Sequence, residues 1–280
     1  MSSHKEKPIP TFTAPLIETH CHLDYLQEAG PEVMVARAQQ QGVQRIVTIA
    51  VAPDNLAQVR QIAAEHAEVF CTQGVHPHEA RFYAAEVGQQ IRSAAESDPN
   101  VVAIGEIGLD YHYDHSPRRQ QQMAFAEQLQ MACDLNKPIV VHTRDADADT
   151  QAILSDFTRL GLRGVIHSFT SGLPLAEYCL SEGFALGFNG IITFRSAENV
   201  RAVLAQTPIN QILLETDSPY LTPVPFRGRE NAPYYLPLVA QAVAEIKQLD
   251  PETVVRQTTH NAEQLFFPHL CSLLTGVNID

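Results

Sequence analysis

The sequence predicts one domain with the α/β architecture of a (β/α)8 barrel, in which eight parallel strands alternate with helices. Short apolar runs alternate with helical patterns along the chain, and the runs number eight. A length of 280 residues with 45% hydrophobic content is enough to bury one large core. We expect a flexible arm at residues 1–14, the barrel at 15–267 and a tail at 268–280.

The predicted strands are rich in Val and Ile and continuously apolar, as expected for parallel strands buried on both faces. They are too short for amphipathic helices. They are Leu16–His20, Arg45–Val51, Val69–Val75, Val101–Ile107, Ile139–His142, Gly164–His167, Ala185–Asn189 and Ile212–Glu215. An open doubly wound sheet is the alternative fold, but it normally has a glycine-rich turn after its first strand, where this chain has His20-Cys21-His22.

Helix signals lie between the predicted strands. Asp54 is an N-cap candidate before Leu56, and Ser116-Pro117 precedes the apolar positions that begin at Met123. One helix is expected after each of these signals. Other helices are predicted at residues 32–41, 84–97, 146–159, 174–182, 198–206 and 234–248, with an extra one near 252–266.

The composition restricts the partners and the compartment. A formal net charge of −13 repels polyanions at long range, so nucleic acid would have to be held locally rather than by a broad surface. No apolar run approaches the roughly 20 residues that cross a bilayer, and the N-terminus lacks a signal-peptide core. Five scattered cysteines without a Cys-x-x-Cys motif indicate reduced thiols. We predict a cytoplasmic protein with no membrane association and no obligate protein partner.

Ionisable residues stand at the carboxyl ends of the predicted strands, where barrels of this kind carry their chemistry. His20 and His22 are separated by one residue, so a strand directs both side chains to one side. The complete set is His20, His22, His76, Glu106, His142, His167 and Asp217. One such residue alone is usually a cap or a hydrogen-bonding group, but together they would form a cluster of buried charge that metal ions could hold.

Two divalent ions fit six of these residues, all but His76, better than one ion does, because four imidazoles and two carboxylates exceed the needs of a single ion. The predicted ligands are divided as follows: His20, His22 and Asp217 for one ion, His142 and His167 for the other, and Glu106 as the bridge. None of the four lysines lies at the carboxyl end of a strand, so no lysine side chain can bridge the two ions. The bridge is therefore left to a glutamate. Histidine ligands favour Zn, Mn, Co or Ni, whereas Mg is common in nucleases.

The segments around these residues resemble the TatD family of metal-dependent deoxyribonucleases, in order from about residue 16 to 267. They are His20-Cys21-His22-Leu23-Asp24, Gly74-Val75-His76-Pro77, Gly105-Glu106-Ile107-Gly108-Leu109-Asp110-Tyr111, His142-Thr143-Arg144-Asp145-Ala146, His167-Ser168-Phe169, Glu215-Thr216-Asp217-Ser218-Pro219-Tyr220-Leu221, Arg227-Gly228-Arg229-Glu230-Asn231 and Thr258-Thr259-His260-Asn261-Ala262. The resemblance implies an amidohydrolase-like barrel and 3′–5′ exonuclease action on DNA, and in places on RNA. The local arginines in an acidic protein favour a single-stranded DNA end over a duplex as the substrate.

Three positions depart from the family pattern. Glu18 replaces the usual Asp, Ser168 stands where Cys is common, and Arg229 replaces the usual Lys. None of them removes a predicted ligand. Glu18 would lie two residues below His20 on the inward face, so we expect it to fill a barrel layer or to support the ligands rather than to react.

The expected chemistry is phosphodiester hydrolysis. Asp217 is predicted to accept the proton of the attacking water as general base, and Glu106 is the second predicted catalytic residue. A guanidinium matches the geometry of a phosphate, and the residues predicted to bind phosphate oxygens are His76, Arg144, Arg227 and Arg229. Aromatic residues that could stack a terminal base are Phe169, Tyr111 and Phe226.

Two alternatives stay open from the residues alone. The same metal centre could hydrolyse an ester, amide or phosphotriester outside nucleic acid, or the barrel could be a non-catalytic scaffold, against which the intact ligand set argues. Other polar residues near the strand ends are expected to have minor roles. His78 is expected to cap the next helix, His112 to lie at the surface, and Asp110 and Tyr111 to shape a loop over the site.

Overall fold

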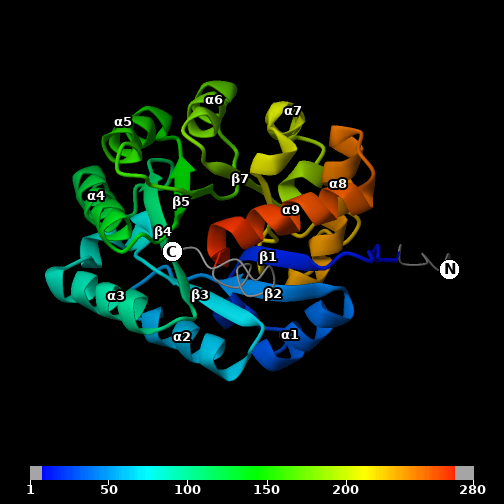
Figure 1. Ribbon diagram of the computed structural model, residues 1–280, viewed down its shortest axis with the longest axis horizontal. Helices are drawn as coiled ribbons and strands as arrows, with labels where there is room; N and C mark the ends of the chain where they lie inside the picture. Colours follow the sequence, from blue (N-terminus) through cyan, green and yellow to red (C-terminus); the bar gives the residue numbers. More distant parts are fainter. Residues whose placement is uncertain (1–7, 269–280) are drawn as a thin grey trace.

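The computed structural model describes residues 8–268, which fold into eight parallel strands with nine α-helices around them (Figure 1). Neighbouring strands pair in chain order, which confirms the predicted (β/α)8 barrel. The strands are β1 (Leu16–Cys21), β2 (Val43–Thr48), β3 (Val69–Gln73), β4 (Val101–Asp110), β5 (Ile139–Arg144), β6 (Gly164–Ile166), β7 (Ala185–Phe188) and β8 (Ile212–Leu214).

The helices lie close to their predicted positions. They are α1 (Pro31–Gln40), α2 (Leu56–Glu65), α3 (Ala85–Ser97), α4 (Arg118–Asp134), α5 (Asp147–Thr158), α6 (Leu173–Ser181), α7 (Glu198–Gln206), α8 (Leu236–Lys247) and α9 (Pro251–Phe266). One predicted cap is wrong: Asn55, not Asp54, is the N-cap residue of α2, and its side chain accepts the backbone N–H groups of Val51 and Ala52. Within residues 8–268, no helix has the length and apolar character needed to cross a membrane.

The predicted boundaries at both termini stay predictions. Residues 1–7 of the arm predicted at 1–14 lie outside the described residues, as does all but the first residue of the tail predicted at 268–280. The cytoplasmic location likewise rests on the sequence alone.

Strands β4 and β5 extend beyond their predicted ends, by three and two residues. They continue because they pair with each other, with Asp110 in register with Arg144. Gly108 permits this close approach: its φ is +136°, and a β-carbon at this position would overlap the carbonyl oxygen of His142. The two strands therefore carry their side chains further into the mouth of the barrel than the others.

Strands β1 and β8 close the barrel. The backbone N–H of Asp217 donates to the carbonyl oxygen of His20 at 2.9 Å, and the N–H of His22 donates to that of Ser218 at 2.8 Å. Both bonds join the carboxyl end of β1 to the segment that follows β8. The segments that carry three predicted ligands are thus held together by the backbone itself.

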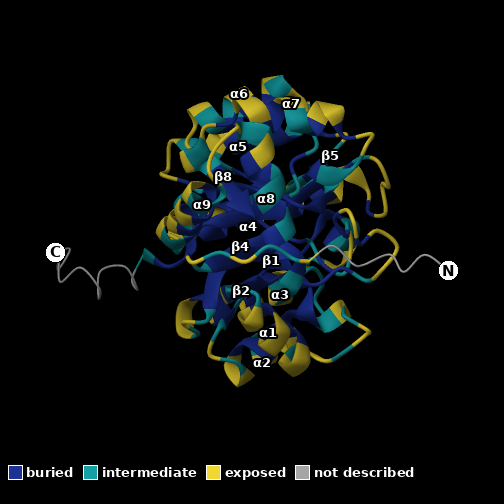
Figure 2. Cartoon of the chain, turned by 90° about the vertical axis from the view of Figure 1, so that its right-hand side faces the viewer, coloured by how far each residue is buried: buried dark blue, intermediate teal, exposed yellow. Residues whose placement is uncertain are grey.

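Apolar side chains fill the barrel beneath the mouth. Val140, Val165 and Leu213 belong to one buried cluster with Phe266 and Phe267. Each of the first three stands two residues before a polar residue of the mouth. Because side chains alternate along a strand, the apolar residue and the polar residue that follows it both point inward. Figure 2 shows this buried interior in dark blue and the outer faces of the helices in yellow.

Helix α9 and the residue after it close the opposite end of the barrel. The ring of Phe267 meets that of Phe70, at the start of β3, with centroids 4.7 Å apart. Asn261 donates its amide N–H groups to the carbonyl oxygens of Ile209 at 2.8 Å and Ile212 at 2.9 Å. The family-like segment around Asn261 therefore has a structural role, away from the mouth.

Candidate metal centre

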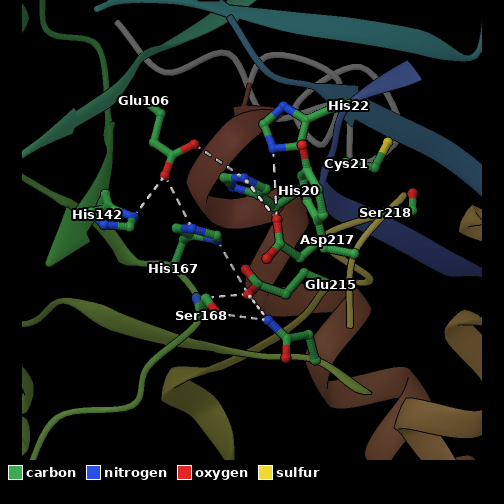
Figure 3. A network of polar contacts seen from close by, with 12 residues as sticks. His20, Cys21, His22, Glu106, His142, His167, Ser168, Glu215, Asp217 and Ser218 are labelled. Atoms are coloured by element: carbon green, nitrogen blue, oxygen red, sulfur yellow. Dashed lines mark hydrogen bonds and ion pairs between the residues drawn. The ribbon is translucent and has the colours of Figure 1, made fainter. Parts of the chain in front are cut away.

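The six predicted ligands meet at the carboxyl end of the barrel, where five of them line one cavity and His20 is buried behind them. His20 is in β1 and His22 follows it, Glu106 is in β4, His142 is in β5, and His167 and Asp217 follow β6 and β8. In Figure 3 their side chains point toward one another. The cavity has a volume of about 870 Å³, and His76 and Arg144 also line it.

Glu106 lies at the centre of the cluster. Its Oε1 is 3.1 Å from Nε2 of His167, 3.2 Å from Nδ1 of His142 and 3.5 Å from Nε2 of His76, and its Oε2 is 3.4 Å from Nε2 of His20. Burial by itself would raise the pKa of this carboxyl, but the imidazoles around it hold its pKa well below the usual value. Glu106 is therefore an anion that faces histidines in or directly after four different strands.

Asp217 faces the two histidines of the first strand. Its Oδ1 is 3.6 Å from Nε2 of His22 and 3.7 Å from Nε2 of His20. Burial opposes ionisation, yet the close imidazole of His22 and those of His167 and His20 lower the pKa of Asp217. The ring of His20 also stacks on that of His167, with centroids 3.6 Å apart and an interplanar angle of 8°.

The donor set fits divalent metal ions. Among the described residues, both ring nitrogens of His20 and Nδ1 of His22 are buried without a hydrogen bond, and an unsatisfied buried polar atom is costly. Imidazole nitrogens and carboxylate oxygens are ordinary ligands of such ions. Three overlapping groups have ligand atoms within 4.8 Å of one another: His20, His22 and Asp217; His20, His167 and Glu215; His76, Glu106 and His142.

Glu215 is a member of the cluster that the sequence analysis did not single out. Its Oε1 accepts the backbone N–H of Ser168 at 2.7 Å and the amide of Asn189 at 3.1 Å, and it lies 3.4 Å from Nδ1 of His167. The sequence does contain a signal for it, because Glu215 is an ionisable residue at the carboxyl end of the strand predicted at Ile212–Glu215.

Glu18 supports the first strand from below. Its Oε1 accepts the backbone N–H of His20 at 3.0 Å and that of Thr216 at 2.9 Å. Burial raises the pKa of Glu18 to about 8. These contacts agree with the supporting role expected for this residue.

Asp110 has a larger role than the loop-shaping one expected for it. Its Oδ2 is 3.0 Å from Nε2 of His142 and 3.0 Å from Nε2 of His78, while its Oδ1 accepts the backbone N–H of Tyr113 at 2.9 Å. A carboxylate at Nε2 of His142 orients that ring so that Nδ1 faces Glu106. Asp110 is thus a positioning residue for one predicted ligand.

His76 is oriented by the turn that follows it. Its Nδ1 accepts the backbone N–H of His78 at 3.1 Å, so His76 is the capping residue here, and the expectation that His78 caps is wrong. Burial and the neighbouring imidazole of His142 keep the pKa of His76 well below its usual value. A neutral ring whose Nδ1 accepts carries its proton on Nε2. In that tautomer the Nε2–H faces Oε1 of Glu106 at 3.5 Å, and the role of His76 in phosphate binding stays a prediction.

The three predicted phosphate-binding arginines are placed differently. Arg144 lines the cavity, with its guanidinium carbon 4.9 Å from the centroid of the Tyr113 ring. Arg227 lies 3.6 Å from the ring centroid of Phe194, and Arg229 lies 5.4 Å from that of Phe226. Neither of these two is among the described residues that line the cavity. Their contact with substrate stays a prediction.

The aromatic residues expected to stack a base are not available at the mouth. Phe169 is 1% exposed and Phe226 is 7% exposed, so both belong to buried clusters. The hydroxyl of Tyr111 donates to Asp149 at 2.6 Å, and the guanidinium of Arg118 covers its ring. The expectation for Phe169 and Phe226 is wrong, because a ring enclosed by the core has no free face.

A closed (β/α)8 barrel with imidazoles and carboxylates gathered at its carboxyl end has the arrangement of the metal-dependent hydrolases that use this fold. A family model described as "TatD related DNase" matches residues 17–267. The chain therefore belongs to the TatD family.

Individual relatives agree with this membership. The uncharacterized metal-dependent hydrolase YcfH of Escherichia coli is 39% identical over 256 residues, which cover 90% of this chain and 95% of the relative. A protein named 3′-5′ ssDNA/RNA exonuclease TatD, from Yersinia pseudotuberculosis, is 36% identical over 239 residues, or 83% and 92% of the two chains. The crystal structure of YJJV, a TatD homolog from Escherichia coli, superimposes with a TM-score of 0.84 at 30% identity and covers 90% of this chain and 97% of that one.

Proposed function

We propose that this protein is a hydrolase that removes nucleotides from the 3′ ends of single-stranded nucleic acid, with two divalent ions bound at the mouth of the barrel. The observation that carries the proposal is Glu106, whose two oxygens lie within 3.5 Å of histidines from four different strands. A carboxylate in this position can bridge two ions. The exonuclease name of the TatD relative at 36% identity supports the choice of substrate.

The ligands of the proposal are the six residues His20, His22, Glu106, His142, His167 and Asp217. When bound, two divalent ions would supply Lewis-acid polarisation of the phosphate and a lower pKa for an attacking water. Mg, Mn or Zn are the ions we propose, because imidazoles and carboxylates together accept all three.

Asp217 is the proposed general base. Its pKa is held below the usual value, so it is ionised at neutral pH and can accept a proton. A catalytic base must lie within reach of the attacking water, and Asp217 points into the cavity beside His20 and His22. Glu106 stays ionised as well and balances the positive charge of the centre.

The substrate is held by local contacts in an acidic protein. His76 lines the cavity with its Nε2 3.5 Å from Oε1 of Glu106, and we propose that this N–H donates to a phosphate oxygen beside the carboxylate, while Arg144 supplies a guanidinium at the rim. We propose that Arg227 and Arg229 reach the next phosphates along the strand. A net charge of −13 disfavours contact with a long stretch of duplex, so an end of a single strand is the proposed substrate.

The test is the release of labelled mononucleotide from a 3′-labelled single-stranded oligonucleotide, first in EDTA and then with Mg, Mn or Zn restored. Glu106→Gln, purified in parallel, keeps the shape of the side chain and removes the bridging charge, so it also controls for a contaminating nuclease. We expect metal-dependent release by the wild type and at least a 100-fold lower rate in the variant, on the order seen when a catalytic group is lost.

Metal analysis separates the site from the substrate. If the wild type binds two ions and still releases no nucleotide with any metal, the nuclease proposal is wrong. A panel of carboxylic esters, amides and phosphotriesters would then identify the hydrolytic reaction of the same centre.

A further inference from the structure

Two exposed tyrosines stand beside the metal centre. Tyr25 belongs to the short 3-10 helix η1 (Leu23–Tyr25) after β1, and Tyr220 belongs to the loop after β8. The ring of Tyr25 is nearly parallel to that of His22, with centroids 5.3 Å apart and an interplanar angle of 17°. The ring of Tyr220 lies 6.2 Å from that of His22 at 68°. Their side chains therefore flank one predicted ligand.

Both rings are accessible, in contrast to the buried aromatics discussed above. Tyr25 is 37% exposed and Tyr220 is 54% exposed. Both line the metal cavity, and both also line a neighbouring hollow of about 690 Å³. They thus stand at the border between the two spaces, where a group next to the reacting phosphate would lie.

The neighbouring hollow suits an uncharged planar group. Among the described residues that line it, the charged ones are Asp24 and Glu230, and none is a cation. This acidic lining disfavours a phosphate, whereas carboxylate and amide oxygens can accept N–H groups from a nucleobase.

Hydrogen bonds to backbone groups hold the segments that carry both tyrosines in place. The Glu230 carboxylate accepts the backbone N–H groups of Gln27 at 2.9 Å and Glu28 at 3.0 Å, which ties the segment after Tyr25 to the loop after β8. The backbone N–H of Tyr220 donates to the carbonyl oxygen of Asp217 at 2.9 Å. A ring on a fixed backbone loses little entropy when a base stacks on it.

We infer that Tyr25 and Tyr220 form a stacking subsite for the nucleobase that neighbours the scissile phosphate. The inference rests on the proposed function, because a nucleic acid at the metal centre is what brings a base to these rings. Stacking on an aromatic ring tolerates any base, so the subsite gives affinity for single strands without sequence preference. It also favours single-stranded ends, since bases inside a duplex are stacked between their neighbours and held in the helix by pairing.

The experiment compares an intact single-stranded oligonucleotide with two others, abasic at the 3′-terminal or at the penultimate position. The variants are Tyr25→Leu, Tyr220→Leu and their combination, with Tyr25→Phe and Tyr220→Phe to keep the rings. Phe82→Leu is the matched control, because Phe82 is 54% exposed but is not among the described residues that line either space. Metal content is measured for every variant, since both rings neighbour His22.

For wild type, we expect kcat/KM on the intact strand to exceed that on one of the abasic strands by about tenfold or more. The difference should come mainly from a lower KM for the intact strand. The double leucine variant should lose that preference, and the phenylalanine variants and Phe82→Leu should keep it. Equal cleavage of all three strands by wild type, or a full preference in the double variant, overturns the subsite while leaving the nuclease in place.

A binding measurement reads the subsite without turnover. The metal-loaded protein is mixed with an oligonucleotide that carries 2-aminopurine at its end and phosphorothioate linkages to slow hydrolysis. Stacking should quench the fluorescence with wild type and not with the double variant. Tyrosine-dependent quenching in a protein that cleaves no nucleic acid would contradict the proposed function but support the subsite, and absence of quenching in an active protein would refute the subsite.

Discussion

At the scale of single residues, the centre depends on side chains that hold others in place. Asp110 contacts Nε2 of His142 at 3.0 Å, and Glu18 fixes the backbone N–H of His20. Neither residue needs to touch a metal ion to matter, because a ligand that is free to rotate binds an ion less tightly. The six predicted ligands and the residues behind them therefore form one unit.

Asp110→Asn tests this support. The amide keeps the volume but removes the charge that orients His142, so we expect metal affinity or activity to fall by about 10- to 100-fold. Titration calorimetry with Mn²⁺ measures the affinity. Asp114→Asn is the matched control, since Asp114 is an exposed carboxylate that pairs with Arg118 at 2.7 Å. Equal affinity in wild type and Asp110→Asn would show that Asp110 does not position the ligand.

At the scale of elements, the approach of β4 to β5 sets the height of the site. Gly108 lies against the backbone of His142, and the pairing of the two strands continues to Asp110 and Arg144. This pairing carries Asp110 and Arg144 to the rim of the cavity. Helix α9 closes the opposite end, so the cavity has a single packed floor of apolar side chains beneath it.

Gly108→Ala should separate the strands. Its β-carbon would overlap the carbonyl oxygen of His142 at a φ of +136°, which we expect to cost about 2–4 kcal/mol of unfolding free energy. Gly42→Ala is the control, because Gly42 also has a positive φ, +83°, but open space around it, so only about 1–2 kcal/mol is expected. Urea denaturation measures both, and equal losses would show that the contact with β5 carries no cost.

At the scale of the whole molecule, the cluster concentrates charged and polar groups inside an otherwise apolar barrel. His20, His22, Glu106 and His167 are all at most 5% exposed. Without ions their nitrogens and oxygens satisfy one another only in part, as the unpaired nitrogens of His20 show. Ions that bind the folded state and not the unfolded state should therefore stabilise the entire barrel.

Metal removal is expected to lower the melting temperature. A free ion concentration of 100 times the dissociation constant contributes about 2.7 kcal/mol per site, which for a chain of this length corresponds to roughly 5–10 °C. Differential scanning calorimetry in EDTA and in Mn²⁺ measures the shift. Glu106→Gln should show a smaller shift than wild type, and identical melting of wild type in both buffers would mean that the native centre binds no ion.

Local patterns predicted the elements well and the contacts between them less well. The order of strands and helices is confirmed, because apolar runs and caps are properties of neighbouring residues. Phe169 and Phe226 were expected at the mouth, yet they are buried, since the sequence near an aromatic residue does not reveal which face of its loop packs inward. For the same reason, the sequence does not reveal that the rings of Tyr25 and Tyr220 are exposed beside the site.

The sequence by itself determined the barrel and the set of residues at its mouth. Strand periodicity and position at a strand end depend on residues a few places apart, and they lead directly to His20, His22, Glu106, His142, His167 and Asp217. Only the tertiary structure decided which atoms face one another: that Glu106 meets four histidines, that Asp110 orients His142, and that Glu215 joins the cluster. Contacts of this kind join segments far apart in the chain, as between Glu18 and Thr216, which are 198 residues apart. Their geometry follows from barrel closure and packing, which no local pattern contains.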